Sequence, residues 1–558
     1  MRSVSGANVT KGQARGQAVD WQRASESVRT LRQRIFRASK EGDLKKIKSL
    51  QKLMLRSEAN ALMSVRRVTQ LSDGRNTPGI DKRVVKTSAG RRNLVQQVLR
   101  HLPWQANPAR RVYIPKTNGK LRPLGIPTIA DRAKQAMVKN ALEPYWEARF
   151  ELSSYGFRPG RGCHDAIGKI YSLARPHKRK KWVVDADIKG AFDNIAHARL
   201  RQLTEHFPAR GLIKQWLNAG YLENGAYHAT DSGTPQGGVI SPLLANIAFH
   251  GMEEALGVRY NNQGNLCSKR ALVRYADDFV IFCESQEDAV AARADITEWL
   301  KTRGLALSEE KTRIRHLSEG FDFLGFNVRQ YRAPRTSRTG WKLLITPSKD
   351  AVKKFRAKVR AIWLAHRGAS VISVLAALNP LIRGWTNYYR TVVSKATFSK
   401  LDSWMFRRAL RYAQHTHPNK PWKWRKNRYW GQLKNGSKSL WVFGDKLTGA
   451  YLLQLCWVPI VRHVLVRGRS SPDDPALQAY WEARRQKLLQ SLPPKWIRLA
   501  RTQKGLCPAC KGTLFGEEPL CASRTGNGPD GGREPSLILR LVHLFCHQQH
   551  YGRTGTAC

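Results

Sequence analysis

The chain has 558 residues and carries 97 Lys and Arg against 41 Asp and Glu, a formal net charge of +56. This length predicts several domains, and 41% hydrophobic residues exclude a disordered chain. The basic residues are spread from end to end, which favours a polyanionic partner. A membrane is not expected, because the sequence contains no signal peptide and no apolar run of 18 residues.

Residues 1–70 form a basic N-terminal extension, in which we predict two helices over residues 21–70, broken near Gly42. Apolar residues at helical spacing make two stripes: Val28, Leu31 and Ile35, then Ile47, Leu50 and Leu53. Lys and Arg fill the remaining faces. These faces fit either ordinary solvated helices or an extension that contacts RNA.

Three regions of different texture follow the extension. Residues 110–330 alternate strand-like runs, helical stretches and Gly/Pro punctuation, which is typical of a mixed α/β catalytic domain. Residues 345–500 are very basic, rich in Trp and predicted to be mostly helical. Residues 501–558 have the Cys and His content of a small module that is held together by metal.

Two adjacent aspartates lie between strand-like runs. Asp277 and Asp278, in residues 275–278 (YADD), separate the apolar residues 271–273 from residues 279–282. This pattern predicts a hairpin with two carboxylates at its tip. Burying two anions beside strands is costly unless a cation binds them, and oxygen ligands suit Mg²⁺.

A second predicted strand is also acidic. In residues 182–188 (WVVDADI), Asp185 and Asp187 are two residues apart and therefore share one face of the strand. Nucleotidyl transfer needs carboxylates from separate strands to hold two metal ions about 3.5–4 Å apart. Spacing alone does not decide which of the two aspartates is the ligand.

In order, the motifs of the chain resemble the reverse transcriptase blocks of bacterial group II intron-encoded proteins. The matching segments are residues 77–81 (TPGID), 111–116 (RVYIPK), 122–127 (RPLGIP), 154–160 (SYGFRPG), 187–193 (DIKGAFD), 233–238 (GTPQGG), 275–278 (YADD), 304–311 (GLALSEEK) and 323–326 (FLGF). So many blocks in one order exclude chance agreement.

The resemblance implies catalytic roles for particular residues. Asp187, Asp277 and Asp278 would hold two Mg²⁺ ions for RNA-directed DNA polymerization. Phe192 would lie under the sugar and exclude a 2′-hydroxyl, a role compatible with a core position. Gln236 would contact the incoming dNTP.

Two cations complete the implied nucleotide site. Lys116 and Arg122 would bind the triphosphate, because cations there offset developing negative charge. Solvated or phosphate-backbone positions are the alternative for both residues.

The basic helical region also resembles this family. Residues 378–390 (LNPLIRGWTNYYR) are similar to its thumb, or maturase, motif, which implies binding of the intron RNA. In residues 422–426 (WKWRK), cations interleaved with aromatics could neutralise phosphates and stack on bases. Helix packing is the alternative role of these aromatics, and we expect it for most of them.

Cys507, Cys510, His543 and Cys546 form two closely spaced pairs that are typical of a structural Zn²⁺ site. The end of the chain resembles the HNH endonuclease module of group II intron proteins. It departs from that pattern because no histidine lies between Cys510 and His543, where the family has its general base. We therefore expect a zinc fold with weak or absent cleavage, although His547 could belong to a rearranged site together with His550.

These observations predict a right-hand polymerase of α/β fingers and palm, a helical thumb or maturase region, and a small HNH-like zinc module. The expected domains are residues 1–70, 71–335, 336–500 and 501–558. The resemblance implies intron RNA, target DNA and dNTPs as partners, splicing and target-primed reverse transcription as functions, and a bacterial cytoplasm with association to the nucleoid as the location. The sequence assigns no oligomeric state.

Rival functions remain at this point. A splicing-only maturase is disfavoured by the complete set of Asp187, Asp277 and Asp278. A polymerase that makes RNA is disfavoured by the bulk of Phe192, and a protein that is mainly an endonuclease by its damaged nuclease motif. A reverse transcriptase recruited by its host, and no longer linked to an intron, stays open.

Overall fold

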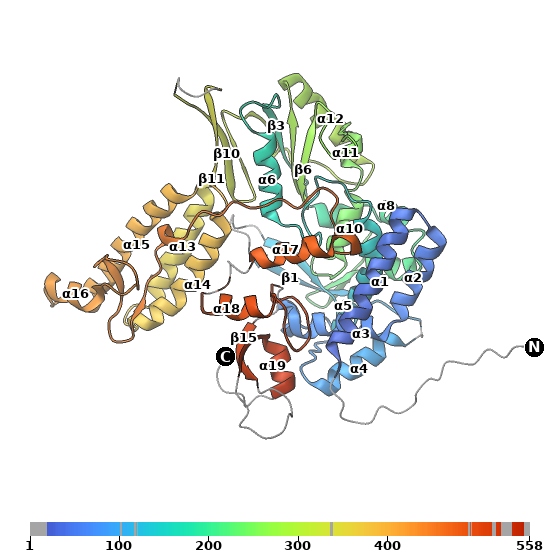
Figure 1. Ribbon diagram of the computed structural model, residues 1–558. Coiled ribbons are helices and arrows are strands. Elements are labelled where there is room, and N and C mark those ends of the chain that lie inside the picture. The colour runs from blue at the N-terminus through green and yellow to red at the C-terminus, as the bar shows by residue number, and fades with distance from the viewer. Residues whose placement is uncertain are drawn as a thin grey trace, which may run out of the picture. The chain divides into compact units, whose positions relative to one another are not determined.

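The computed structural model describes residues 19–100, 103–115, 119, 121–334, 339–488, 492, 494–515, 520–525 and 538–551. These residues form two compact units, each assembled from separate stretches of the chain (Figure 1). The first unit comprises Met1–Phe150, Phe192–Ala248 and Ser470–Cys558. The second comprises Glu151–Ala191 and Phe249–Arg469.

The N-terminal extension of the first unit contains three α-helices, so the prediction of two was wrong. They are α1 (Trp21–Glu41), α2 (Leu44–Arg56) and α3 (Glu58–Arg66). The predicted break at Gly42 is confirmed, because this residue ends α1 in the left-handed conformation with φ of 77°. The second break comes from Ser57, whose hydroxyl accepts a hydrogen bond from the backbone N–H of Asn60 and thereby starts a new helix.

Among its described residues, the first unit also contains six further α-helices and a small mixed sheet before the C-terminal stretch. The helices are α4 (Ser88–Leu99), α5 (Ile129–Glu147), α7 (Ala191–Asn194), α8 (His197–Leu203), α9 (Arg210–Asn218) and α10 (Ser241–Ala248). The sheet has the strand order β2-β1-β4-β5, formed by β1 (Ala109–Pro115), β2 (Leu121–Ile126), β4 (Tyr221–Glu223) and β5 (Ala226–His228). Helix α5 packs against α1, α2 and α3 and is buried along most of its length.

The C-terminal stretch belongs to the same unit as the N-terminal helices. It contains α17 (Gln478–Leu488), α18 (Pro494–Thr502), the hairpin of β15 (Leu520–Thr525) and β16 (Ile538–His543), and α19 (Leu544–Tyr551). Arg32 of α1 connects the N-terminal helices to the start of the C-terminal stretch and to α5. Its guanidinium donates hydrogen bonds to Asp473 at 2.7 and 2.8 Å and to Glu143 of α5 at 2.9 Å.

The second unit is built on an antiparallel sheet with the strand order β6-β7-β3-β8. Its strands are β3 (Trp182–Asp187), β6 (Ala271–Tyr275), β7 (Asp278–Cys283) and β8 (Arg313–His316). The helices α6 (Cys163–Leu173), α11 (Met252–Ala255) and α12 (Gln286–Lys301) accompany it. Strands β6 and β7 are the predicted hairpin, and their apolar residues are almost fully buried.

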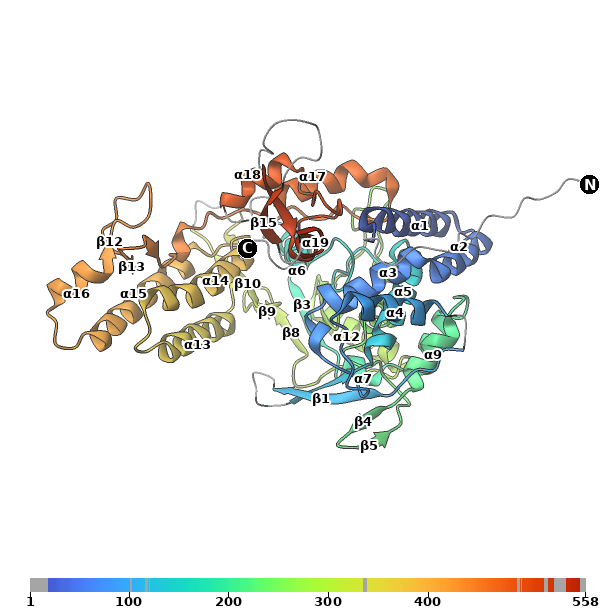
Figure 2. The same ribbon diagram turned by 90° about the horizontal axis from the view of Figure 1, so that it is seen from below.

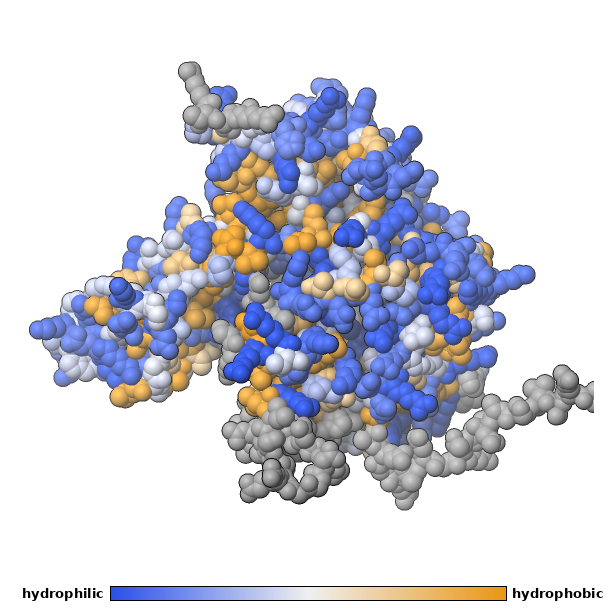
Figure 3. Space-filling model, in the orientation of Figure 1, coloured by the Kyte–Doolittle hydropathy of each residue, from blue (hydrophilic) through white to orange (hydrophobic). Residues whose placement is uncertain are grey.

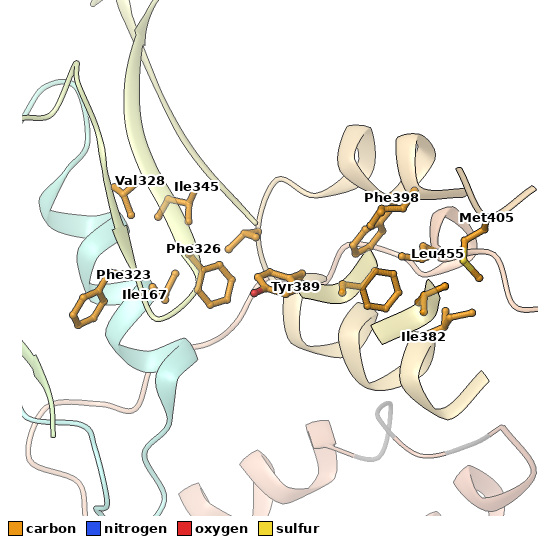
Figure 4. Close-up of a cluster of buried hydrophobic side chains, with 14 of the residues drawn as sticks. Ile167, Phe323, Phe326, Val328, Ile345, Ile382, Tyr389, Phe398, Met405 and Leu455 are labelled. Carbon is orange, nitrogen blue, oxygen red and sulfur yellow. The ribbon is translucent and has the colours of Figure 1, made fainter. Parts of the chain in front are cut away.

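A second sheet links these strands to a helical region. It has the order β11-β10-β9, from β9 (Phe321–Phe323), β10 (Phe326–Arg332) and β11 (Trp341–Pro347). The helices are α13 (Lys349–Ala365), α14 (Val371–Tyr389), α15 (Lys395–Thr416) and α16 (Trp422–Tyr429) (Figure 2). One hydrophobic core runs from Phe323 and Phe326 of the strands to Ile382, Tyr389 and Phe398 of the helices (Figure 4).

The predicted mostly helical region over residues 345–500 is interrupted between α16 and α17. After α16, the chain forms the short strands β12 (Trp430–Gly431), β13 (Val442–Asp445) and β14 (Ala450–Tyr451). Asn379 of α14 holds the chain that follows, since its side chain donates to the carbonyl of Tyr451 and accepts from the N–H of Leu453. No helix among the described residues is long and apolar enough to cross a bilayer.

Replacement of Arg32 tests how much its ion pairs with Asp473 and Glu143 stabilise the first unit. Arg32→Met would leave the carboxylates of Asp473 and Glu143 buried with less positive charge, and removal of one partner from a buried ion pair is costly. We expect the free energy of unfolding of this unit to fall by about 2–3 kcal/mol, measured by chemical denaturation. The control Arg29→Met, at an exposed position of the same helix, should change it by less than about 0.5 kcal/mol. Equal effects of the two substitutions would contradict a stabilising role of these ion pairs.

Candidate active site and metal centre

The register of the second unit's sheet brings the predicted carboxylates together. Strand β3 pairs with β7 so that Asp187 lies directly opposite Asp278. Asp277 precedes Asp278 at the turn of the β6–β7 hairpin, where Ala276 has a φ of 58°. Three carboxylates from two strands therefore meet at one end of the sheet.

The same register separates Asp187 from Asp185, which the spacing of the sequence could not do. Asp185 pairs with Val280 on one side and Arg313 on the other, one strand repeat away from the hairpin tip. Burial raises the pKa of Asp185 to about 6 against the opposing effect of Arg315. Asp185 therefore lies beside the carboxylate cluster, opposite Val280 instead of Asp278.

The three carboxylates form a site that is deficient in positive charge. Asp278 is accessible at the hairpin tip, but the surrounding protein still restricts its hydration. This restricted hydration, followed by the negative charges of Asp277 and Asp187, raises the pKa of Asp278 to about 7. Adjacent carboxylates with this property favour a bound divalent cation, and an all-oxygen donor set fits Mg²⁺.

Lys311 is a residue of the site that the sequence reasoning missed. Its Nζ lies 2.6 Å from Oδ2 of Asp187, and this contact raises the pKa of the lysine. Backbone hydrogen bonds place the segment, because the N–H of Ser308 donates to the carbonyl of Asp187 and the N–H of Lys189 to that of Ala306. Lys311 ends the matching block of residues 304–311, but block order alone did not reveal its contact.

Buried residues next to the β6–β7 hairpin hold its tip in position. Arg274 of β6 is fully buried and donates hydrogen bonds to the carbonyl of Ala276 and to Oγ of Ser154. Burial lowers the pKa of Arg274 to about 10, although Glu151 opposes this effect. Gly156 lies against the backbone of Ala276 so closely that any side chain would clash with it. The hairpin tip is therefore fixed by a buried cation and a close backbone contact.

The predicted nucleotide loop, residues 233–238, lies in the first unit and is anchored to Phe192. The N–H of Thr234 donates to the carbonyl of Phe192 at 2.6 Å, and that of Gly233 to the carbonyl of Ile195 at 2.8 Å. Gly233 has a φ of 83°, and a side chain there would strike the backbone of Phe192 and Asp193. Phe192 is half-buried.

Gln236 connects this loop to the β1–β2 hairpin. Its carbonyl accepts a hydrogen bond of 2.9 Å from the N–H of Gly125 in β2, and its side chain is half-exposed. Arg122 lies on the same strand, opposite Ile114, and is exposed. Lys116 lies outside the described residues. The structure thus joins Phe192, Gln236 and the strand of Arg122 within one unit.

The predicted zinc ligands converge in the C-terminal stretch. The Sγ atoms of Cys507, Cys510 and Cys546 and a ring nitrogen of His543 all lie within 4.8 Å of one another, and all four residues are buried. Nδ1 of His543 lies 3.2 Å from Sγ of Cys510, while its Nε2 lies 3.0 Å from the carbonyl of Thr513. A histidine held in this way presents one nitrogen to a metal and donates with the other.

A basic residue of the N-terminal helices also contacts this cluster. Nη2 of Arg66 in α3 donates to Sγ of Cys546 at 3.3 Å, and its guanidinium lies 4.8 Å from the ring of Trp21. Three thiolates and one histidine around Zn²⁺ would carry a net negative charge, which Arg66 partly offsets. Trp21 also packs on the core of the C-terminal stretch. The donor set and its surroundings therefore fit a structural zinc ion.

Comparison with known proteins finds three family matches in chain order. Residues 17–98 match the "N-terminal domain of reverse transcriptase", and residues 114–328 match "Reverse transcriptase (RNA-dependent DNA polymerase)". Residues 352–430 match the "Group II intron, maturase-specific domain". The chain thus contains a reverse transcriptase domain that is followed by a maturase-specific domain.

Several individual proteins and one solved structure are similar to this chain. Protein YkfC of Escherichia coli is 36% identical over 57% of this chain and 93% of its own length. Group II intron-encoded protein LtrA of Lactococcus lactis is 32% identical over 52% of this chain, and the chain spans 62% of that protein. A solved telomerase structure from Candida albicans covers 58% of this chain and 61% of its own, at 12% identity and a TM-score of 0.32. The chain belongs to the family of group II intron reverse transcriptases and maturases.

The raised pKa of Asp278 predicts how the stability of the metal-free protein depends on pH. An unfolded aspartate ionises near pH 4, but the folded one near pH 7, so ionisation costs folding free energy as the pH rises between these values. Asp278→Asn should therefore raise the melting temperature in EDTA at pH 8 by about 1–2 °C, with little change at pH 5. The exposed Asp350→Asn should show no such pH dependence. A gain of equal size at both pH values would argue against the carboxylate cluster.

The Cys/His cluster predicts bound zinc. Purified wild-type protein should contain about one zinc ion per chain by mass spectrometry of the metal, since four ligands of this kind make a closed tetrahedral site. Cys510→Ser should lose most of it and melt at lower temperature. Cys267→Ser removes an exposed cysteine from another part of the chain and should retain the zinc. Zinc-free wild-type protein with normal stability would rule out a structural zinc site.

Proposed function

We propose that this protein copies RNA into DNA at the carboxylates of the β3 strand and the β6–β7 hairpin. The observation that carries the proposal is the register that sets Asp187 opposite Asp278, with Asp277 beside it and Lys311 against Asp187. Two strands thereby supply the donor set that nucleotidyl transfer requires. Membership in the reverse transcriptase family fixes the class of chemistry.

Different residues of the site would have different roles in the reaction. Mg²⁺ held by Asp187, Asp277 and Asp278 would activate a primer 3′-hydroxyl and stabilise the charge that develops on pyrophosphate. Arg274 and Gly156 keep the hairpin tip in one position, which reduces the reorganisation needed during the reaction. Lys311 holds a positive charge beside Asp187 and limits the repulsion among the carboxylates.

The loop at residues 233–238 would select the nucleotide. Its hydrogen bond to the backbone of Phe192 fixes the position of this aromatic residue relative to Gln236. A phenylalanine beneath the sugar leaves no room for a 2′-hydroxyl and so favours dNTPs over rNTPs. Arg122 and Lys116 would contact the triphosphate.

The partner of the polymerase would be the intron RNA itself. The maturase-specific domain over residues 352–430 and the net charge of +56 support binding to a structured group II intron. We propose that this binding promotes splicing and that the complex then inserts the intron into target DNA by target-primed reverse transcription. This activity would take place in the bacterial cytoplasm and at the nucleoid.

The C-terminal stretch would serve this function as a structural zinc module. Its contacts with Arg66 and Trp21 support a role in stabilising the first unit. An endonuclease function of this stretch has less support, because the sequence between Cys510 and His543 contains no histidine that could act as a general base. The zinc module would be the last of the four predicted domains, after the N-terminal extension, the fingers and palm, and the maturase region.

The decisive experiment is extension of a DNA primer on an RNA template with dNTPs and Mg²⁺. Wild-type protein should make full-length cDNA and should use rNTPs poorly. Asp277→Asn/Asp278→Asn should reduce incorporation by about a thousandfold or more, because these groups would hold the metal ions. RNA affinity of each protein is measured in parallel by filter binding.

The matched control is Asp350→Asn/Glu298→Gln, which removes the same charge from two exposed positions of the second unit. It should extend primers as wild type does. If folded wild-type protein binds intron RNA tightly but incorporates no dNTP, the polymerase proposal fails and a splicing-only maturase takes its place. Full polymerase activity without any preference for intron RNA would instead favour a host-recruited reverse transcriptase.

A further inference from the structure

A buried carboxylate, that of Glu151, faces the arginine that supports the hairpin of Asp277 and Asp278. Glu151 is 7% exposed and Arg274 is 0% exposed. Oε2 of Glu151 lies 4.0 Å from Nη2 of Arg274. Among the residues that the structure describes, no hydrogen-bond donor reaches this oxygen. Its negative charge is therefore balanced mainly by the charge of Arg274.

The other oxygen of Glu151 is fixed to the backbone at the start of α11. Oε1 accepts hydrogen bonds from the N–H of Gly251 at 2.9 Å and from the N–H of Glu253 at 2.8 Å. Both donors are backbone groups, which cannot turn away as a flexible side chain can. The carboxylate is therefore held in one orientation, with Oε2 toward Arg274.

Arg274 passes this restraint on to the tip of the hairpin. Its Nη1 donates to the carbonyl of Ala276 at 3.2 Å, and its Nη2 donates to Oγ of Ser154 at 2.8 Å. The carbonyl carbon of Ala276 is bonded to the backbone nitrogen of Asp277, so the direction of this carbonyl sets the peptide plane from which Asp277 begins. Ala276 has a φ of 58°, a conformation that an L-residue keeps only where its surroundings hold it.

Burial makes the charges of Glu151 and Arg274 depend on each other. Burial raises the pKa of Glu151, and the charge of Arg274 is the largest influence against this shift. Burial lowers the pKa of Arg274 to about 10, and the charge of Glu151 is the largest influence against that shift. The negative charge of Asp277 also favours the charged form of Arg274. A buried arginine that lost Glu151 as its counter-ion would therefore be drawn toward Asp277.

We infer that Glu151 is a positioning residue for the polymerase, which acts through Arg274 to hold the peptide before Asp277 in place. With Glu151 charged, Arg274 pairs with a buried carboxylate, and the hairpin presents Asp277 and Asp278 to Mg²⁺. Without this charge, Arg274 would compete with the metal ion for Asp277. The inference rests on the proposed function, because it concerns the same carboxylate site.

Glu151→Gln tests the inference, because it removes the charge, keeps the shape of the side chain and sets an amide against Arg274. We expect the Mg²⁺ concentration for half-maximal primer extension to rise about tenfold and kcat to fall about tenfold, while KM for dNTP changes less than about twofold. Electron paramagnetic resonance then measures Mn²⁺ binding to the full-length protein without nucleic acid. Binding to the hairpin should weaken by a similar factor, with Asp277→Asn/Asp278→Asn as the background.

Glu254→Gln is the matched control. The surface over α11 and α12 is mostly hydrophilic (Figure 3). Glu254 is an exposed residue of α11 and directly follows the buried Glu253. Its replacement removes one negative charge from the surface of the same unit. This variant should match the wild type in kcat, in Mg²⁺ requirement and in Mn²⁺ affinity, and a loss equal to that of Glu151→Gln would overturn the inference.

The double variant Glu151→Met/Arg274→Met separates positioning from stability. Apolar side chains of similar length often replace a buried ion pair without loss of stability, so this variant should melt near the wild-type temperature. It should nevertheless bind Mn²⁺ about tenfold more weakly, because the carbonyl of Ala276 loses its donor. Wild-type Mn²⁺ affinity in the double variant, or in folded Glu151→Gln, would overturn the inference.

The outcome is separable from that of the polymerase test. If the wild-type protein extends primers and Glu151→Gln equals it in Mg²⁺ requirement and Mn²⁺ affinity, the role of Glu151 fails and the proposed function stands. If the wild-type protein incorporates no dNTP while Glu151→Gln weakens Mn²⁺ binding, the proposed function fails and Glu151 still positions the carboxylates for a metal ion.

Discussion

Repulsion among like charges at the end of one sheet is the constraint on which the second unit depends. Asp187 and Asp277 lie close enough to Asp278 that their negative charges, together with restricted hydration, raise its pKa. Lys311 places a positive charge beside Asp187, and buried residues beneath the hairpin hold it in position. Buried Arg274 and the close contact at Gly156 prevent the turn from relaxing outward. The carboxylates are therefore held in an arrangement that suits a divalent cation.

Long-range contacts of two arginines help to join the separate stretches of chain that make up the first unit. Arg32 binds Asp473 across 441 residues of sequence, and Arg66 reaches Cys546 across 480. Both arginines come from the basic N-terminal helices, whose charge also suggests contact with RNA. The same extension thus provides buried cations for internal pairing and exposed ones for a polyanion. The loss of the N-terminal helices would be expected to expose the core of the C-terminal stretch, which Trp21 covers.

Much of the polymerase could be predicted from the sequence. Its strand-like runs alternate with helical stretches, and its motifs follow the order of the reverse transcriptase blocks. The hairpin of Asp277 and Asp278 and the cluster of three cysteines and one histidine are where the patterns put them. What the sequence could not supply was register: only strand pairing sets Asp187, and not Asp185, opposite Asp278. The contact of Lys311 with Asp187 was missed for the same reason, since it depends on backbone hydrogen bonds between distant segments.

The aromatic residues of the helical region show a further limit of sequence patterns. Residues 422–430 hold three tryptophans and a tyrosine among cations, and composition alone gives them the same environment. In the structure, Tyr429 and Trp430 are buried, whereas Trp422 and Trp424 are exposed. The partner that makes Trp422 different is Trp441, nineteen residues later and on another element. A pair of parallel rings depends on two elements at once, so the sequence of one element cannot reveal it.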